Sequence, residues 1–227
     1  MLGVKPDGVT MDSVSDASQG AGELRSYGGE AGDARVARRR AALLDATLDL
    51  LSEPEEGPVT VRGICTHAGL TPRYFYESFE NVDILVGATY DGVITEIAES
   101  ARLAFDEGAD PRAKVTSAVR AIVDVIDEDR RKGRLIFSDA LGSPVLTERR
   151  AEAVETFAAL TSRSAQQVSR VRSEEELTAA SHFQVGGFGR VLASWTEGRL
   201  SLDKDRLVAL CAHMLWPESR SHAVGDR

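Results

Sequence analysis

The chain has 227 residues, of which 42% are hydrophobic and 28% are charged, and its formal net charge is -9. This length allows one sizeable core, or a small domain joined to a larger one. No run of about 18 apolar residues occurs and no signal-peptide pattern opens the chain, so we expect no membrane span and a cytoplasmic protein. Cys65 and Cys211 are far apart in sequence and are expected to be free thiols. The acidic total argues against non-specific coating of nucleic acid but allows a local basic surface.

Residues 1–33 are rich in glycine, serine and aspartate. They are predicted to form a disordered leader, because too little apolar surface is available to offset the entropy of ordering them. Helix-forming residues begin at Ala34. Apolar residues spaced by three and four predict one amphipathic helix that ends before residue 53. Its apolar stripe is formed by Ala41, Leu44, Leu48 and Leu51.

Two short helices are predicted next. Thr60 can cap a helix that runs to Ala68, and Gly69 can end it in a left-handed conformation. Thr71, followed by proline, signals a second start, and this second helix should end near Phe79. Two short helices with glycine at the corner predict a helix-turn-helix.

The rest of the chain is also helical in pattern. Start signals occur at Asn81, Asp110, Ser173 and Asp203, a short helical piece is expected over 135–140, and an apolar stripe covers 154–168. Pro217 is the predicted stop of the last helix. No alternation of period two is present, so the predicted fold class is all-α with about nine helices. The expected domains are a small one over 34–82 and a larger one over 83–217, followed by a flexible tail over 218–227.

The start of the second short helix carries side chains that the predicted core does not use. The residues that can close that core are Ile64, Ala68, Leu70 and Phe75, and Phe79 can pack back onto the Ala41–Leu51 stripe. Four residues are left for a partner, Thr71, Arg73, Tyr74 and Tyr76. In a helix-turn-helix this end of the second helix enters the major groove, where arginine can bind guanine through two hydrogen bonds and tyrosine can reach phosphate. The alternative for one of the two nearby tyrosines is packing within the small domain. The expected DNA contacts are Arg38, Arg39, Arg40, Thr60, Thr71, Arg73, Tyr74, Tyr76 and Asn81.

This segment resembles the TetR family of bacterial transcriptional regulators. The matching residues are Thr60-Val61-Arg62, Ile64, Ala68-Gly69-Leu70-Thr71, Phe75-Tyr76, Phe79 and Leu85. The resemblance covers residues 35–85, and the late stretch "WTEGRLSLDKDRLVALCAHML" is similar to the final helix pair of that family. It implies DNA contacts from Thr60, Thr71, Arg73, Tyr74 and Tyr76, and a ligand-binding and dimerisation domain in the remaining helices.

Dimerisation also has a physical motive, because a single helix-turn-helix reads only a few base pairs. The expected dimer interface is formed by Phe188, Leu192, Trp195, Leu207, Leu210 and Met214. An apolar ligand pocket is expected from Tyr90, Phe105, Phe137, Phe157, His182 and Phe183, although His182 and Phe183 could equally be ordinary core residues. The glycines at 186, 187 and 189 are predicted to permit close approach of another helix.

The hypothesis is therefore a homodimeric, sequence-specific DNA-binding transcriptional regulator, a repressor that an apolar or amphipathic small molecule releases from double-stranded operator DNA. Activation in place of repression stays open. Val82 stands where family members usually carry lysine, Gly63 replaces a better helix former, and Glu77 adds negative charge to the second helix. These departures leave an alternative, an all-helical small-molecule carrier or enzyme with a degenerate DNA-binding module. No catalytic or metal-ligating pattern is present, so no enzymatic activity, metal or cofactor is expected.

Overall fold

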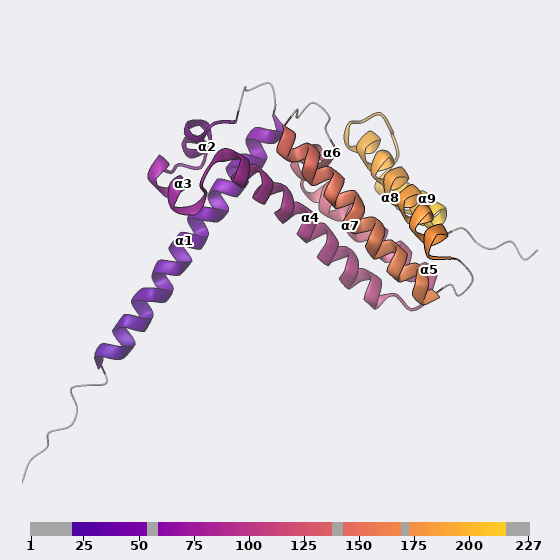
Figure 1. The fold of residues 1–227 in the computed structure, drawn as a ribbon, viewed down its shortest axis with the longest axis horizontal. Coiled ribbons are helices and arrows are strands. Elements are labelled where there is room, and N and C mark those ends of the chain that lie inside the picture. The colour runs from indigo at the N-terminus through magenta and orange to yellow at the C-terminus, as the bar shows by residue number, and fades with distance from the viewer. Residues whose placement is uncertain (1–19, 54–58, 138–142, 169–172, 217–227) are drawn as a thin grey trace, which may run out of the picture.

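The computed structural model describes residues 20–53, 59–137, 143–168 and 173–216, without the side chains of residues 20–31 and 164–168. Within these ranges the chain forms nine α-helices and no strand, which confirms the all-α prediction (Figure 1). The helices are α1 (Gly20–Ser52), α2 (Val61–His67), α3 (Pro72–Ser78), α4 (Val82–Glu107), α5 (Pro111–Glu128), α6 (Arg130–Phe137), α7 (Pro144–Val168), α8 (Glu174–Thr196) and α9 (Lys204–Leu215).

Helices α1 to α3 enclose a small hydrophobic core. Ile64 of α2 and Phe75 of α3 are fully buried, and they pack with Phe79 against Leu43 and Ala46 of α1. The predicted packing of Ile64 with Phe75, and of Phe79 on α1, is thus confirmed. The first half of α1 projects away from this core (Figure 1).

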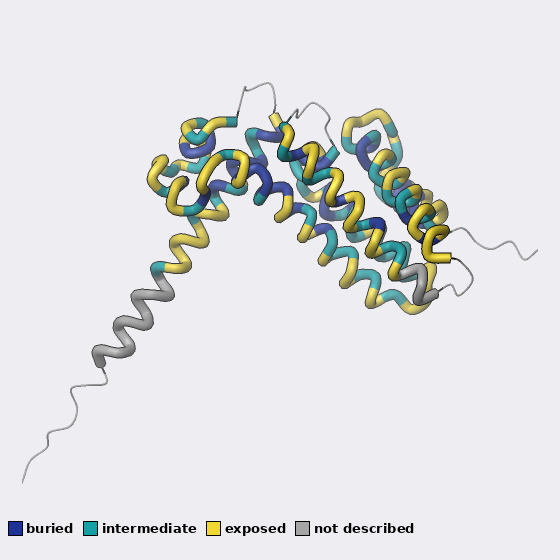
Figure 2. The backbone as a smooth tube through the Cα atoms, viewed as in Figure 1, coloured by how far each residue is buried: buried dark blue, intermediate teal, exposed yellow. Residues whose placement is uncertain are grey.

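Helices α4 to α9 surround a second, larger core. The longest of them, α4, packs along α5 and α7, while α8 packs on α7 and α9 packs on α5. Tyr90, Val123, Leu135 and Leu207 are among the fully buried side chains that fill the space between these helices. Buried residues follow the inner side of each helix, and the outer sides are exposed (Figure 2).

The predicted helix starts are confirmed by their caps. The Asn81, Asp110 and Asp203 side chains each accept a hydrogen bond from a backbone N–H in the first turn of the following helix. Ser173 forms a full capping box with Glu176. Each side chain accepts a hydrogen bond from a backbone N–H that has no partner within the helix. A single capping residue therefore predicts where each of these helices starts.

Helices α1 and α6 start earlier than the sequence predicts. Helix α1 begins at Gly20, fourteen residues before the predicted start, because extending an existing helix costs far less than starting a new one. Residues 1–19 of the expected leader lie outside the described residues. Helix α6 covers Arg130–Phe137 in place of 135–140, of which the last three residues are also not described. Pro217 and the expected tail over 218–227 are likewise outside the described ranges.

The apolar stripe of α1 was also predicted on the wrong face in part. Ala41 is exposed and Leu43 is fully buried. The reason is that α1 is covered on two sides. Leu43 faces the small core, while Leu48 and Leu51 contribute to the large one.

Candidate nucleic-acid interface

The turn between α2 and α3 has the geometry that the sequence predicts for a helix-turn-helix. Gly69 lies in the left-handed region at φ 66°, where a residue with a side chain would be strained. The backbone N–H of Leu70 donates to the Cys65 carbonyl at 2.8 Å, which closes the end of α2. The chain then enters α3 at Thr71, whose side chain makes no capping hydrogen bond. The Thr71 hydroxyl is therefore not occupied by its own helix.

Helix α3 divides its side chains between the core and solvent. Phe75 is fully buried, whereas the Arg73 side chain is 84% exposed and Tyr76 is 62% exposed. The ring of Tyr76 meets Phe75 edge-on, at 5.2 Å between centroids, so it is supported from the core side. Tyr74 is half-buried beneath Arg39, whose guanidinium carbon lies 4.3 Å from the ring centroid. One tyrosine of the pair thus packs partly within the small domain, as the alternative foresaw.

Three consecutive arginines in the middle of α1, Arg38, Arg39 and Arg40, have different surroundings. Arg38 is exposed to solvent. Arg39 stacks on Tyr74 and forms an ion pair with Glu77 at 3.5 Å. Arg40 lies over the Phe79 ring at 4.2 Å and donates to the Ser78 carbonyl at 3.3 Å. These contacts use the Arg40 guanidinium to hold α1 against the end of α3, which is a different role from the expected DNA contact.

Thr60 and Asn81 both use their side-chain oxygens as helix caps. The Gly63 N–H donates to the Thr60 hydroxyl at 3.1 Å, and the Ile84 N–H donates to the Asn81 side chain at 2.9 Å. A Cβ atom added at Gly63 would lie 3.3 Å from the same Thr60 hydroxyl, so this glycine lets the cap approach closely. Val82 is partly buried against both cores. The Thr60 cap therefore accounts for Gly63, and packing against the two cores accounts for Val82, without reference to DNA.

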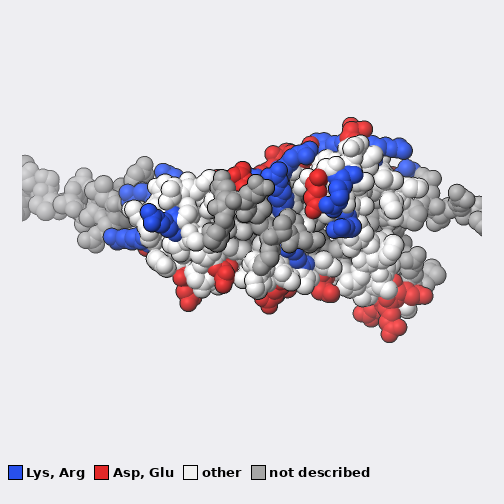
Figure 3. Space-filling model, turned by 90° about the horizontal axis from the view of Figure 1, so that it is seen from above, with Lys and Arg blue, Asp and Glu red and all other residues white. Residues whose placement is uncertain are grey.

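Basic side chains lie near the end of the molecule that carries α1 to α3 and across the middle of the face seen in Figure 3. Acidic side chains gather mainly along the lower edge of the same view. The net charge of -9 is thus unevenly distributed, which permits a local attraction for an anionic partner.

A polar cluster that sequence reasoning missed joins the two cores. Arg131 of α6 pairs with Asp45 and Asp49 of α1 and with Asp129, which directly precedes α6. His67 of α2 lies 2.9 Å from the second carboxylate oxygen of Asp49. The cluster therefore links the helix-turn-helix to α6. No sequence signal could have found it, because Arg131 and Asp49 are 82 positions apart.

The charges of this cluster are stabilised by their partners. Burial alone would raise the pKa of Asp49, but hydrogen bonds from Arg131 and His67 outweigh it and hold the pKa below its ordinary value of 3.8. The pKa of Asp129 is also lowered, chiefly by its hydrogen bond with Arg131. Because both pKa values are depressed in the folded state, the stabilisation is present at neutral pH and is lost as the pH falls through the folded-state values.

We expect Arg131→Gln to lower the free energy of unfolding by about 1–2 kcal/mol at pH 7, a modest value because solvent screens a side chain that is one-third exposed. The difference should begin to shrink below about pH 4, where the carboxylates of the unfolded chain become protonated, and should vanish at lower pH, below the depressed folded-state pKa values. Urea denaturation at pH 7 and pH 3 measures both values. Arg102→Gln, which removes an exposed pair with Asp106, is the control and should cost about 0.5 kcal/mol or less. An equal loss for Arg131→Gln at the two pH values would contradict this role of the cluster.

Several solved structures have a fold similar to that of this chain. The fatty acid degradation regulator FadR from Bacillus halodurans is 15% identical and superposes with a TM-score of 0.68, covering 80% of this chain and 96% of that one. A TetR family transcription regulator from Marinobacter aquaeolei VT8 is 19% identical, with a TM-score of 0.59, over 81% and 96% of the two chains. The chain has the TetR fold. The resemblance seen in the sequence is confirmed at the level of the fold.

A third structure with this fold was solved with a ligand. The transcriptional regulator FadR from Bacillus subtilis in complex with stearoyl-CoA is 14% identical, with a TM-score of 0.65, over 77% of this chain and 96% of that one. No protein-family model matches the sequence, and no curated protein matches it. At these identities the comparison establishes the TetR fold.

The residues expected to line a ligand pocket are dispersed in the TetR fold. Tyr90 is buried in the large core, where burial raises the pKa of its hydroxyl to about 12, and Phe137 and Phe157 pack partly buried against the same core. Phe105 lies under Lys114, at 5.2 Å from the ring centroid to the ammonium nitrogen. Phe183 is 82% exposed, so its assignment to a pocket is wrong. Its position on the outer side of α8 could not be separated from the inner side by periodicity alone.

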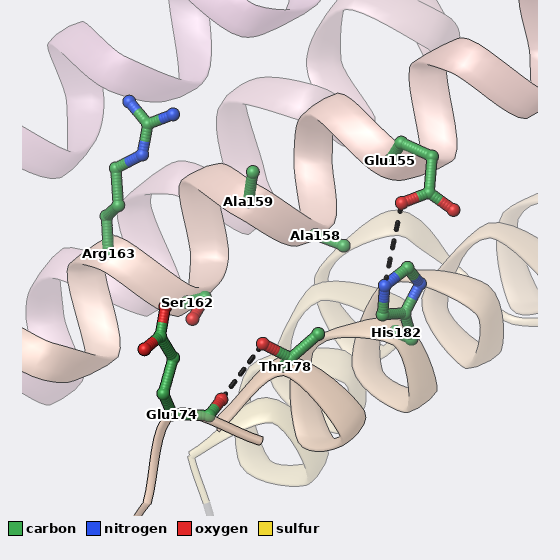
Figure 4. A pocket seen from close by; sticks show the side chains of 8 residues that line it. All are labelled: Glu155, Ala158, Ala159, Ser162, Arg163, Glu174, Thr178 and His182. Atoms are coloured by element: carbon green, nitrogen blue, oxygen red, sulfur yellow. Dashed lines mark hydrogen bonds and ion pairs between the residues drawn. The ribbon is translucent and has the colours of Figure 1, made fainter. Parts of the chain in front are cut away.

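His182 lies in a groove of about 330 Å³ between α7 and α8 (Figure 4). At one end, its Nε2 atom is 3.6 Å from a Glu155 carboxylate oxygen. Small side chains form the middle of the groove, and Arg163 and Glu174 lie at the other end (Figure 4). This groove is open to solvent and is lined by both polar and apolar groups, and His182 is the one residue of the expected pocket that lines it.

Three of the six residues expected at a dimer interface are core residues. Leu192, Trp195 and Leu207 are buried, and the Trp195 indole N–H donates to the Leu202 carbonyl at 2.9 Å. A partner cannot reach them without opening the large core, so their assignment is wrong. Phe188 packs partly against that core, whereas Leu210 and Met214 are exposed.

The outer side of α8 and α9 instead carries apolar side chains that this chain leaves open. Phe183 and Met214 are the most exposed large apolar residues, at 82% and 64%. The Gln184 side chain donates to the Leu215 carbonyl at 3.0 Å, which brings this part of α8 near the C-terminal end of α9. Nothing lies within 4 Å of a Cβ atom added at Gly186 or Gly187. Among the described residues, the close helix approach predicted for these glycines is seen only at Gly189, where an added Cβ atom would lie 3.9 Å from a ring carbon of Phe137 of α6.

No helix in the described ranges is long and apolar enough to cross a bilayer.

Proposed function

We propose that this protein is a sequence-specific DNA-binding transcription regulator, acting as a homodimeric repressor that a small molecule releases from its operator. The observation that carries the proposal is that α3 buries one side in the core and exposes polar side chains on the other. Phe75 anchors the helix in the core, while Thr71, Arg73 and Tyr76 are exposed to solvent. An arginine and a tyrosine offered on the second helix of a helix-turn-helix are the groups that bind guanine and phosphate in the major groove.

The phosphate backbone would be held by a second group of contacts. Arg38 is exposed on α1, and Arg39 of the same helix stacks on Tyr74 of α3. Their charges would add an attraction that weakens with salt and does not depend on sequence. The aromatic contact keeps α1 and α3 in a fixed relation, so both helices would approach one duplex together.

A homodimer is supported by the outer side of α8 and α9. Phe183, Leu210 and Met214 are exposed apolar side chains, and Gly186 and Gly187 leave room for another helix. Two copies joined through this side would form a four-helix interface. Such a pair would present two copies of α3 to successive major grooves on one side of the duplex.

An apolar or amphipathic effector is supported by the aromatic residues of the large domain and by the stearoyl-CoA complex of one structure with the TetR fold. The Arg131 cluster supplies a physical connection, because it ties α6 of the large domain to α1 and α2. A ligand that shifts α6 would change the position of the helix-turn-helix. A coupling of about 1–3 kcal/mol would reduce operator affinity about 5- to 150-fold.

The direct test is selection of genomic fragments by the full chain, followed by sequencing of the bound DNA. We expect a small set of fragments to be enriched about 1,000-fold or more over bulk DNA at physiological salt. Addition of the effector should release them. Recovery of fragments in proportion to their abundance would refute the proposal and favour the alternative of a carrier or enzyme with a degenerate DNA-binding module.

A further inference from the structure

Glu77 lies between the two arginines that face the proposed DNA surface. One carboxylate oxygen accepts a hydrogen bond from Arg73 Nε at 3.0 Å, and the other lies 3.5 Å from a terminal nitrogen of Arg39. Arg73 and Glu77 are one turn apart on α3, while Arg39 comes from α1. The carboxylate therefore connects the two helices at the place where the DNA would lie.

The four side chains of this connection differ in how firmly they are held. Of the three charged side chains, Arg39 is the most enclosed, because it stacks on Tyr74 and is 26% exposed. Glu77 is fixed by Arg39 and in turn holds Arg73, which is otherwise exposed. Arg39 of α1 therefore restrains the Glu77 side chain, and Glu77 in turn restrains the Arg73 side chain.

The atom through which Arg73 is held is informative. The hydrogen bond uses Nε, and within the described residues the structure shows no other hydrogen bond or ion pair of Arg73. Its two terminal nitrogens are the donors that can bind O6 and N7 of guanine together. A carboxylate on Nε leaves this pair available and fixes the plane in which it lies.

We propose that Glu77 is a positioning residue that sets base selectivity, an inference that rests on the proposed function. It holds Arg73 in the orientation that reads guanine, so less side-chain freedom is lost when DNA binds. The same carboxylate repels phosphates and partly neutralises Arg39 and Arg73, so it weakens binding to all DNA. Glu77 therefore lowers general affinity and raises the preference for the operator.

The test compares Glu77→Ala and Glu77→Gln in the full chain, with a selected genomic fragment and a random duplex of equal length. Glu77→Ala is expected to bind the random duplex about 3- to 10-fold more tightly, because a charge that repels phosphate is removed. Its ratio of operator to random affinity should fall about fivefold or more, because Arg73 is no longer oriented. Glu77→Gln keeps an oxygen that can accept from Arg73 Nε, so its ratio should stay within about twofold of the wild type while random-DNA affinity rises.

Glu80→Gln is the matched control, since Glu80 is exposed two residues after the end of α3 and forms no ion pair with another described residue. It should change both affinities by the same factor. Equal changes on both duplexes for Glu77→Ala, with a wild type that does prefer the fragment, would refute the positioning role alone. A wild-type chain that prefers no fragment would refute the proposed function, and the inference with it. Thermal unfolding of each variant, expected within about 2 °C of the wild type, shows that the fold is kept.

Discussion

Phe183→Glu is expected to make the protein monomeric at micromolar concentration and to weaken operator binding about 100-fold or more. Phe183 is 82% exposed on α8, and the next residue, Gln184, donates a hydrogen bond to the C-terminal end of α9. Truncation of a central aromatic residue in an interface commonly costs about 2–4 kcal/mol, and a buried unpaired carboxylate adds a desolvation cost. Both copies of the residue change in a twofold interface, so the effect is doubled.

Operator binding should fall with the dimer, because a monomer contacts one half-site only. Sedimentation velocity measures the oligomeric state, and a gel-shift titration measures the affinity. Leu103→Glu is the control, since Leu103 is an exposed apolar residue on α4 and not on α8 or α9. It should stay dimeric and keep its operator affinity. A Phe183→Glu chain that sediments as a dimer would show that the two copies meet through another surface.

Arg73→Ala is the second change with a large expected effect. It should cost about 1–3 kcal/mol of operator affinity, or about 5- to 150-fold, and should relax the preference at one G·C pair in each half-site. The physical reason is the loss of two parallel hydrogen bonds to guanine. Stability should hardly change, because the Arg73 side chain is 84% exposed and its one ion pair with Glu77 is on the surface.

Fluorescence anisotropy with the operator and with single-base variants measures both the affinity and the base preference. Arg38→Ala is the matched control, because Arg38 is an exposed arginine on α1 that does not lie on the second helix. It should weaken operator and random DNA by the same factor and reduce the salt dependence by about one ion. If Arg73→Ala also weakened both DNAs equally, Arg73 would be a phosphate contact and not a base reader.

The features that sequence reasoning predicted well are those set by neighbours in the chain. The caps at Asn81, Asp110, Ser173 and Asp203 and the turn at Gly69 each depend on a few consecutive residues, and each was confirmed. The outward position of Arg73 follows from the burial of Phe75 two residues later, since the two lie on different sides of a helix.

The features it missed depend on contacts between distant segments. Leu192, Trp195 and Phe183 all lie on α8, and periodicity cannot say which apolar side faces the core and which faces a partner. For the same reason Ala41 was placed in the stripe of α1, a helix covered from two directions. The ion pairs of Arg131 with Asp45 and Asp49 bring together residues that no local pattern relates.

We propose that the exposed side of α3 enters the major groove of DNA. Methylation of guanine N7 by dimethyl sulfate, on a selected fragment with the full chain bound, tests it most directly, because N7 lies in that groove. We predict two protected guanines about one helical turn apart, and recovery of their reactivity with Arg73→Ala. Guanines that stay as reactive as in free DNA while the fragment is bound would contradict the claim.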